Sequence, residues 1–112
     1  MSIAIGPAVE SHDSAAQISP QQKNAAVQAL VRSATECIAH AVEADPRFGR
    51  NVGSKIGDLI VDSIPPCIGP VRAMIDGYDR YYGAGTGQAF FMGPYLDELP
   101  TVVTKWSADA AP

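Results

Sequence analysis

Two residues with reactive side chains stand one helical turn apart in a long amphipathic segment. Cys37 and His40 are separated by two residues, so a helix places the thiol and the imidazole side by side. Such a pair suits half of a zinc site, or a cysteine nucleophile with a histidine base. A complete zinc site would also need Cys67 and a carboxylate such as Glu43, because the only other histidine is His12. We expect instead two reduced, buried, non-catalytic thiols and no metal.

Two pairs of carboxylates recur at helical spacing. Asp58 and Asp62 lie four positions apart, and Asp76 and Asp79 lie three apart. Paired carboxylates perform acid–base catalysis when burial raises the pKa of one member. Each pair lies beside or opposite an apolar stripe, where a helix normally faces solvent. We therefore interpret both pairs as solvated charges.

A glycine-rich stretch from Gly83 to Gly87 has the pattern G-x-G-x-G, a partial match to phosphate-binding loops. Such loops follow a strand and precede a helix whose N-terminus meets the phosphate. Here a helical pattern precedes the glycines, and no P-loop lysine follows them. The sequence favours a helix cap followed by a tight turn.

Aromatic residues are concentrated late in the chain, where seven of the eight lie from Tyr78 onward. Helical spacing places Tyr78 and Tyr82 together and turns Tyr81 toward another side. An aromatic patch beside a loop is a usual protein-contact surface. The residues that we predict to form a partner or ligand surface are Tyr78, Tyr81, Tyr82, Phe90, Phe91, Met92 and Tyr95.

The elements that must position these residues are helices. Ser19, Pro20 and Gln22 supply an N-cap, a proline at the first helical position and a capping box. Apolar residues then recur at helical spacing until Asp45-Pro46, which marks the exit. We predict a first helix over residues 19–44, and we expect Ser19→Ala to cost about 1 kcal/mol of stability.

A second apolar stripe begins at Val52, after Asn51 as a possible cap, and Pro65-Pro66 ends it. Gly53 and Gly57 lie next to this stripe. Each glycine weakens a helix by about 1 kcal/mol. We therefore predict both to be sites of close packing against another helix, within the fold or across a dimer.

A third helix opens at Gly69-Pro70 and ends at Gly83, which is a natural C-terminal cap. Residues 88–92 are readable as one helical turn or as a short buried strand. Gly93-Pro94 interrupts them, and residues 97–106 are predicted to form a short last helix.

The chain has the size of one domain. Of its 112 residues, 46% are hydrophobic, which is enough to form a core. The charged fraction of 18% is lower than a disordered chain would carry. We predict an all-α domain over residues 18–106, a small bundle of three main helices plus a short C-terminal helix. The glycine-rich loop joins the third helix to the C-terminal segment. Residues 1–17 are expected to be a flexible arm and residues 107–112 a flexible tail.

Charge and hydropathy argue against several classes of function. The net charge is −4, and the eight Lys and Arg residues are scattered singly, which disfavours a nucleic-acid surface. The longest aliphatic run, Leu59-Ile60-Val61, is far too short to span a membrane. The N-terminus lacks the basic and apolar regions of a signal peptide, so we expect a cytoplasmic protein.

Residues 64–87 combine a proline–glycine entry, a short helical stretch with an aspartate and a Thr-Gly turn. The residues that form this pattern are Pro66, Gly69, Asp76, Thr86 and Gly87. The stretch resembles the pre-toxin linker helices of bacterial polymorphic toxins, which have these three features. The resemblance covers about a fifth of the chain, and we do not expect a toxin domain to follow it.

We interpret the protein as an acidic, non-catalytic interaction or assembly protein that acts through its helical or aromatic surface. Its partner is another protein or a second copy of itself. The alternative is a helical protein that binds a small apolar molecule near Met74, Tyr78, Phe91 and Met92. An enzyme of unknown class comes third. We expect no cofactor.

Overall fold

The computed structural model describes residues 18–49 and 52–110, and this part of the chain contains helices and no strand. The prediction of an all-α bundle is confirmed. The elements in chain order are α2 (Pro20–Ala44), α3 (Val52–Ser63), the 3₁₀ turn η2 (Pro65–Cys67), α4 (Ile68–Tyr82), α5 (Thr86–Phe90), the π-helical turn η3 (Phe91–Tyr95) and α6 (Leu96–Ala110).

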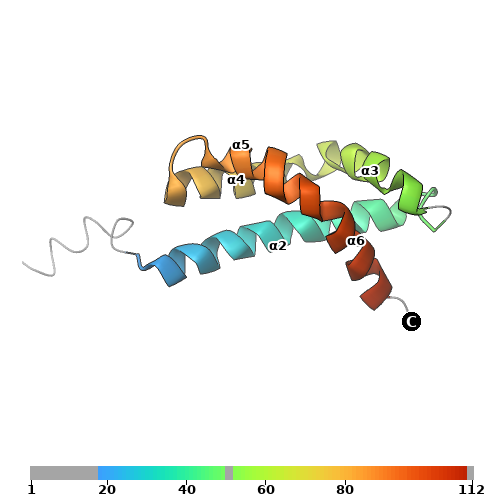
Figure 1. Cartoon of the computed structure of the whole chain (residues 1–112), viewed down its shortest axis with the longest axis horizontal. Coiled ribbons are helices and arrows are strands. Elements are labelled where there is room, and N and C mark those ends of the chain that lie inside the picture. Colours follow the sequence, from blue (N-terminus) through green and yellow to red (C-terminus); the bar gives the residue numbers. More distant parts are fainter. Residues whose placement is uncertain (1–17, 50–51, 111–112) are drawn as a thin grey trace, which may run out of the picture.

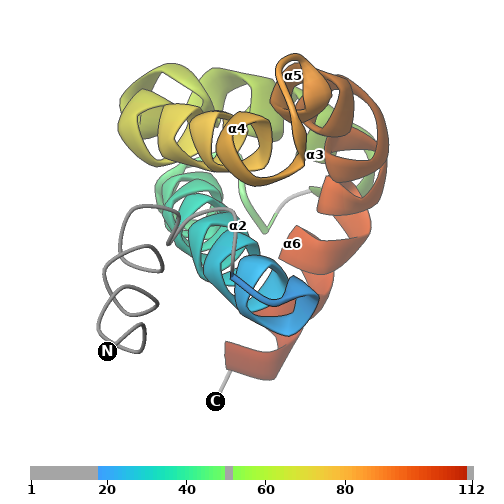
Figure 2. The same ribbon diagram turned by 90° about the vertical axis from the view of Figure 1, so that its left-hand side faces the viewer.

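Helix α2 is the element on which the others pack. It runs along the length of the bundle, with α3, α4 and α5 on one side and α6 crossing it at an angle (Figure 1). Seen along α2, helix α4 lies to one side and the α5–α6 segment to the other (Figure 2). Helix α2 contacts α3, η2, α4 and α6.

The start of α2 follows from its predicted capping box. The Ser19 hydroxyl oxygen accepts a hydrogen bond from the Gln22 N–H at 3.1 Å, and the Gln22 side-chain oxygen accepts one from the Ser19 N–H at 2.9 Å. Two N–H groups that lack partners within the helix are thereby satisfied. The predicted boundary of 19–44 is confirmed at both ends, since α2 is capped by Ser19 and ends before Asp45.

The core lies between α2 and the helices around it. Large side chains from α3, α4 and α6 pack against the middle of α2, where small residues such as Ala34 and Ala39 let the neighbours approach closely. The buried hydrophobic residues are Val27, Ala34, Ile38, Ala39, Val42, Leu59, Ile60, Cys67, Val71, Met74, Tyr95, Leu99 and Val103.

A disulfide joins Cys37 of α2 to Cys67 of η2, with their Cα atoms 5.9 Å apart. The prediction of two reduced thiols was therefore wrong. It rested on the expectation of a reducing compartment, whereas the packing of η2 against α2 brings the two residues within bonding range.

Among the described glycines, close contacts occur at Gly77 and Gly87 and not at Gly57. A Cβ at Gly57 would meet no described atom within 4 Å, so Gly57 is not a close-packing site within the described chain. Gly53 lies where side chains are not described, and a dimer contact at either glycine stays a prediction. A Cβ at Gly77 would instead overlap the Leu30 side chain, and one at Gly87 would overlap the backbone of Ile75.

From Thr86 to Ala110 the chain is one continuous helical segment, so the predicted interruption at Gly93-Pro94 was wrong. The π turn η3 explains this continuity. The Leu96 N–H reaches the carbonyl of Phe91, five residues back, and Pro94 lies inside this wider turn. Helix α6 is also longer than the predicted 97–106.

No helix in the described ranges is both long enough and apolar enough to cross a lipid bilayer.

Candidate functional site

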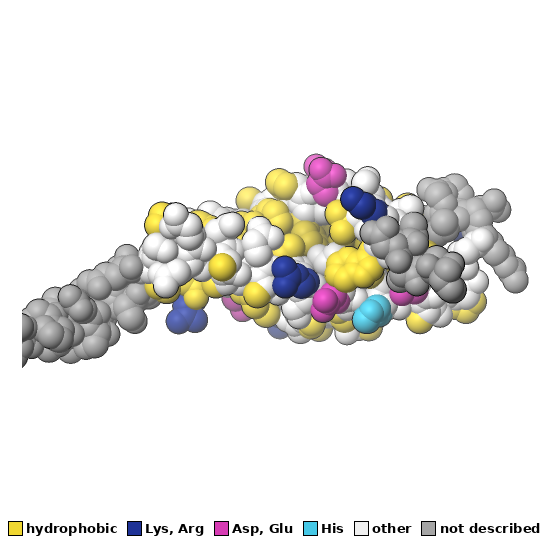
Figure 3. Space-filling view, turned by 90° about the horizontal axis from the view of Figure 1, so that it is seen from below, with side chains coloured by type: hydrophobic (Ala, Val, Ile, Leu, Met, Phe, Trp, Pro, Cys, Tyr) yellow, Lys and Arg dark blue, Asp and Glu magenta, His cyan; other side chains and the backbone are white. Residues whose placement is uncertain are grey.

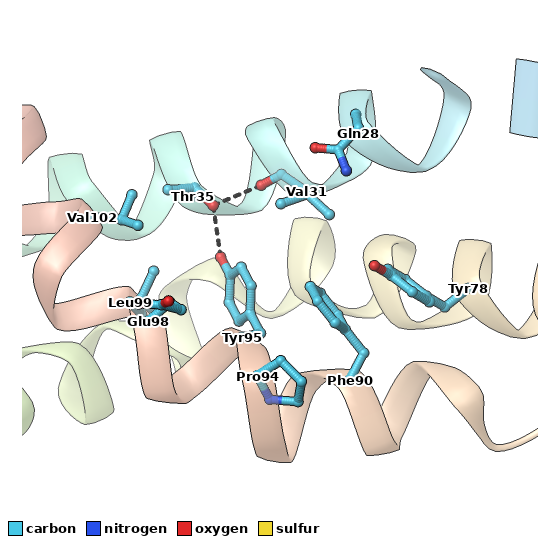
Figure 4. Close-up of a pocket in the computed structure, with 10 residues that line it drawn as sticks. All are labelled: Gln28, Val31, Thr35, Tyr78, Phe90, Pro94, Tyr95, Glu98, Leu99 and Val102. Atoms are coloured by element: carbon cyan, nitrogen blue, oxygen red, sulfur yellow. Dashed lines mark hydrogen bonds between the residues drawn. The ribbon is translucent and has the colours of Figure 1, made fainter. Parts of the chain in front are cut away.

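A groove of about 290 Å³ opens between α2 and the segment that runs from the end of α4 through α5 and η3 into α6. Its lining is mainly apolar and aromatic (Figure 4). The residues that line it are Gln28, Val31, Thr35, Tyr78, Phe90, Pro94, Tyr95, Glu98, Leu99 and Val102.

Each wall of the groove comes from one stripe of a helix. On α2, Gln28, Val31 and Thr35 follow the i, i+3, i+7 spacing of a single face. On the opposite wall, Leu99 and Val102 of α6 continue the stripe that begins at Tyr95 of η3. The groove is thus held by regular helices, and its shape is fixed by the crossing of α2 and α6.

Three aromatic rings form a row along one side of the groove. The rings of Tyr78 and Phe90 stack with their centroids 4.3 Å apart, and those of Phe90 and Tyr95 meet at a tilt with centroids 5.6 Å apart. Such contacts add to the stabilisation from burial. The row lies below α2 with its rings side by side (Figure 4), so the apolar wall is already formed without an occupant.

The base of the groove holds a buried hydrogen-bonded pair. The Thr35 hydroxyl donates to the Val31 carbonyl at 2.7 Å, so the Tyr95 hydroxyl donates to the Thr35 oxygen at 2.9 Å. Burial raises the pKa of Tyr95, while the hydrogen bond with Thr35 acts in the opposite direction. The base is therefore neutral, and both hydroxyl protons are already bound.

Polar side chains lie at the edges of the groove, and one of them, Glu98, is charged. Gln28 on α2 and Glu98 on α6 are exposed at opposite lips. Seen from below, the surface of the molecule carries hydrophobic side chains interspersed with charges of both signs (Figure 3). An occupant of this site would insert apolar groups between the walls and place polar groups at the lips.

Three of the residues suspected of catalytic chemistry, Cys37, Asp62 and Asp79, have structural partners instead. Cys37 lies in the disulfide and so offers no thiol to His40. Asp62 forms an ion pair with Arg47 at 2.7 Å. The Asp79 carboxylate accepts hydrogen bonds from backbone N–H groups in the glycine-rich turn. Among the described residues, no three His, Cys, Asp or Glu side chains lie close enough to hold a metal ion.

The structure divides the predicted aromatic surface. Tyr78, Phe90 and Tyr95 line the groove, and Phe91 packs against the core. Tyr82 stays near the Tyr78 ring at 5.5 Å. Met92 is 61% exposed on the outside of the segment. Tyr81 lies in a separate hollow beside Leu30 and Gly77.

Seven of the ten residues that line the groove were missed by the sequence prediction. The residues concerned are Gln28, Val31, Thr35, Pro94, Glu98, Leu99 and Val102. Their helical spacing was visible, but nothing in the sequence shows that α6 crosses α2 at this height. The pairing of the two stripes is a property of the tertiary fold.

No protein-family model matches this chain, and neither a curated protein nor a solved structure matches it.

Proposed function

We propose that this protein is a non-catalytic interaction protein that receives apolar side chains of a protein partner in the groove between α2 and α6. The single observation that carries the proposal is the preformed apolar groove of about 290 Å³. Sites for small molecules usually have about 300–1,000 Å³ and enclose most of the ligand. A shallow groove at the lower limit of that range suits one or two anchoring side chains of a larger partner.

The alternative of a small apolar ligand has less support. It was expected near Met74, Tyr78, Phe91 and Met92. Met74 is fully buried and belongs to the core cluster. Phe91 packs against that cluster, and Met92 faces outward. Of the four residues, Tyr78 alone lines the groove.

Photo-crosslinking in the source cell tests the proposal. A benzophenone amino acid replaces Gln28, which is exposed at the lip of the groove, and in a control replaces the adjacent exposed Ala29, which does not line it. Adjacent positions on a helix differ by about 100° in direction. We expect a discrete covalent adduct from position 28 and none from position 29. Equal adducts, or none at position 28, would remove the groove as a partner site.

The disulfide bears on the location in which the protein works. Thiols in the cytosol are kept reduced, so a bond between Cys37 and Cys67 supports an oxidising compartment. This is at odds with the cytoplasmic location expected from the N-terminal sequence, and that expectation stays a prediction.

A further inference from the structure

We infer that the partner received by the groove is a second copy of this chain, paired through antiparallel α6 helices. This inference rests on the proposed function, because the groove between α2 and α6 is the receiving surface. It adds the identity of the partner, the element that pairs and the direction of pairing.

The groove continues along α6 into a second hollow. That hollow has about 370 Å³ and is lined by Thr101, Val102, Lys105 and Trp106. Val102 lines both spaces and is 40% exposed. An open track therefore follows α6 from Tyr95 to Trp106, which spans about 16 Å at the rise of an α-helix. Such a track has the length of about three helical turns and suits a helix as occupant.

The charges along this track are complementary to themselves. Glu98 and Lys105 are both exposed and lie seven residues apart, on the same line of α6. Lys105 is the only basic residue in α6. If two copies of α6 pack antiparallel about an axis between Thr101 and Val102, Glu98 of each copy faces Lys105 of the other. A parallel pair would instead place like charges together.

The same symmetry supplies an anchor for each groove. Trp106 lies four residues beyond Val102 and would reach the region of Glu98 in the other copy, where Tyr95 and Leu99 form the wall. An aromatic side chain buries about 150–250 Å² and is a common anchor at interfaces. Each copy thus contributes one tryptophan and receives one, as an isologous interface requires.

Charge reversal at Glu98 and Lys105 tests this pairing, because each single reversal should weaken the dimer and the double reversal should restore it. Glu98→Lys and Lys105→Glu each create two like-charge contacts across the seam, so each single variant should dimerise at least about tenfold more weakly. The double variant restores both pairs and should dimerise as the parent does. An equimolar mixture of the two single variants should form a heterodimer, because both lysines of the first variant then face glutamates of the second.

The readout is sedimentation velocity over a range of concentrations at low salt, together with the fluorescence of Trp106, the only tryptophan in the chain. Glu98→Lys changes the net charge from −4 to −2 (−4 + 2), and Lys105→Glu changes it to −6 (−4 − 2). General repulsion between acidic chains would therefore strengthen dimers of the first variant and weaken those of the second. The proposed pairing predicts weakening in both.

Matched substitutions of exposed valines locate the seam. Val102→Asp should abolish the dimer, whereas Val61→Asp, at a 66% exposed position on α3, should leave it intact. Circular dichroism confirms that each variant is folded. A parent chain that stays monomeric at every concentration, or single variants that dimerise as the parent does, would overturn the inference. The inference would also be overturned if the chain stayed monomeric and position 28 crosslinked to a different protein. That result would leave the proposed function in place.

Discussion

The carboxylate of Asp79, a candidate for acid–base chemistry in the sequence, stabilises the turn that precedes α5. Its oxygen accepts hydrogen bonds from the N–H groups of Gly85 at 3.1 Å and Gly87 at 2.9 Å, at the start of α5. A carboxylate in this position satisfies backbone donors and opposes the positive end of the helix. Gly83 and Gly85 have φ values of 117° and 89°, which favour glycine. The glycine-rich stretch is therefore a cap, as its sequence indicated.

Three glycine-to-alanine variants should separate by the space around each residue. Gly57→Ala should stabilise the protein by about 0.4–1 kcal/mol, because its Cβ enters open space and alanine favours the helix. Gly77→Ala should be near neutral, because the overlapping end of Leu30 is able to move. Gly87→Ala should cost about 1–3 kcal/mol or more, because the overlapping atoms belong to the backbone of Ile75.

Urea denaturation of the three variants at two protein concentrations measures these differences. A loss of stability in Gly57→Ala would contradict the open space at this site. If that loss grew on dilution, it would place a contact between copies on α3 and not on α6.

The carboxylate at the C-terminal end of α2 should titrate at unusually low pH. Hydrogen bonds from the Arg47 side chain and backbone lower the pKa of Asp45 from 3.8 to about 2. Because the folded pKa is lower than the unfolded one, this contribution to stability is present above about pH 4 and disappears as the pH falls toward 2. Arg47→Gln should raise the pKa of Asp45 toward its usual value, as measured by carbon-13 NMR titration. An unchanged pKa would show that the backbone alone sets it.

At the scale of elements, local signals predicted α2, α3 and α4 well. Helix ends are marked by Ser19, by Asp45-Pro46 and Pro65-Pro66, and by Gly83. These residues restrict the backbone locally, so their effect can be recognised in the sequence alone. The α5–α6 segment was misread because Gly93-Pro94 is a strong local breaker. A π turn accommodates that breaker when the segment gains packing on both sides of it, through Phe90 before it and through Tyr95 and Leu99 after it. Tertiary packing outweighed the local signal.

The disulfide between α2 and η2 should contribute strongly to stability. It closes a loop between residues 30 positions apart, for which chain entropy gives about 3–4 kcal/mol. We expect dithiothreitol to lower the free energy of unfolding by about that amount. The Cys37→Ala/Cys67→Ala variant should show a similar loss and no further response to the reductant.

Alkylation of the protein as isolated from its source cell checks whether the bond forms there. The disulfide predicts no alkylated cysteine before reduction and two after it. Two thiols that react without reductant, in the unfolded chain, would support the cytoplasmic interpretation instead.

At the scale of the molecule, α2 connects the core and the groove. One of its faces carries Ala34, Ile38 and Val42 into the core, and an adjoining stripe carries Gln28 and Val31 to the groove. The sequence shows both stripes as helical periodicity. It does not show which later helix meets each one, since this depends on how α4 turns back and how α6 crosses. The fold class could therefore be predicted from the sequence. Of the groove, only the aromatic wall could be predicted.

This central position of α2 predicts the order in which the molecule opens. Ala34, Ile38, Ala39 and Val42 are fully buried, and α3, η2, α4 and α6 all contact α2. Amide hydrogens at the centre of α2 should exchange through global unfolding alone, and so most slowly. Amides of α5 should exchange faster, because this five-residue helix packs mainly on α4 and η3. Hydrogen exchange followed by NMR measures the opening free energy at each amide.

Reduction of the disulfide should lower protection in η2 and the adjoining end of α3 more than in α5, because Cys67 bonds η2 covalently to α2. Greater protection in α5 than at the centre of α2 would show that the α5–α6 segment, and not α2, is the most stable part of the fold.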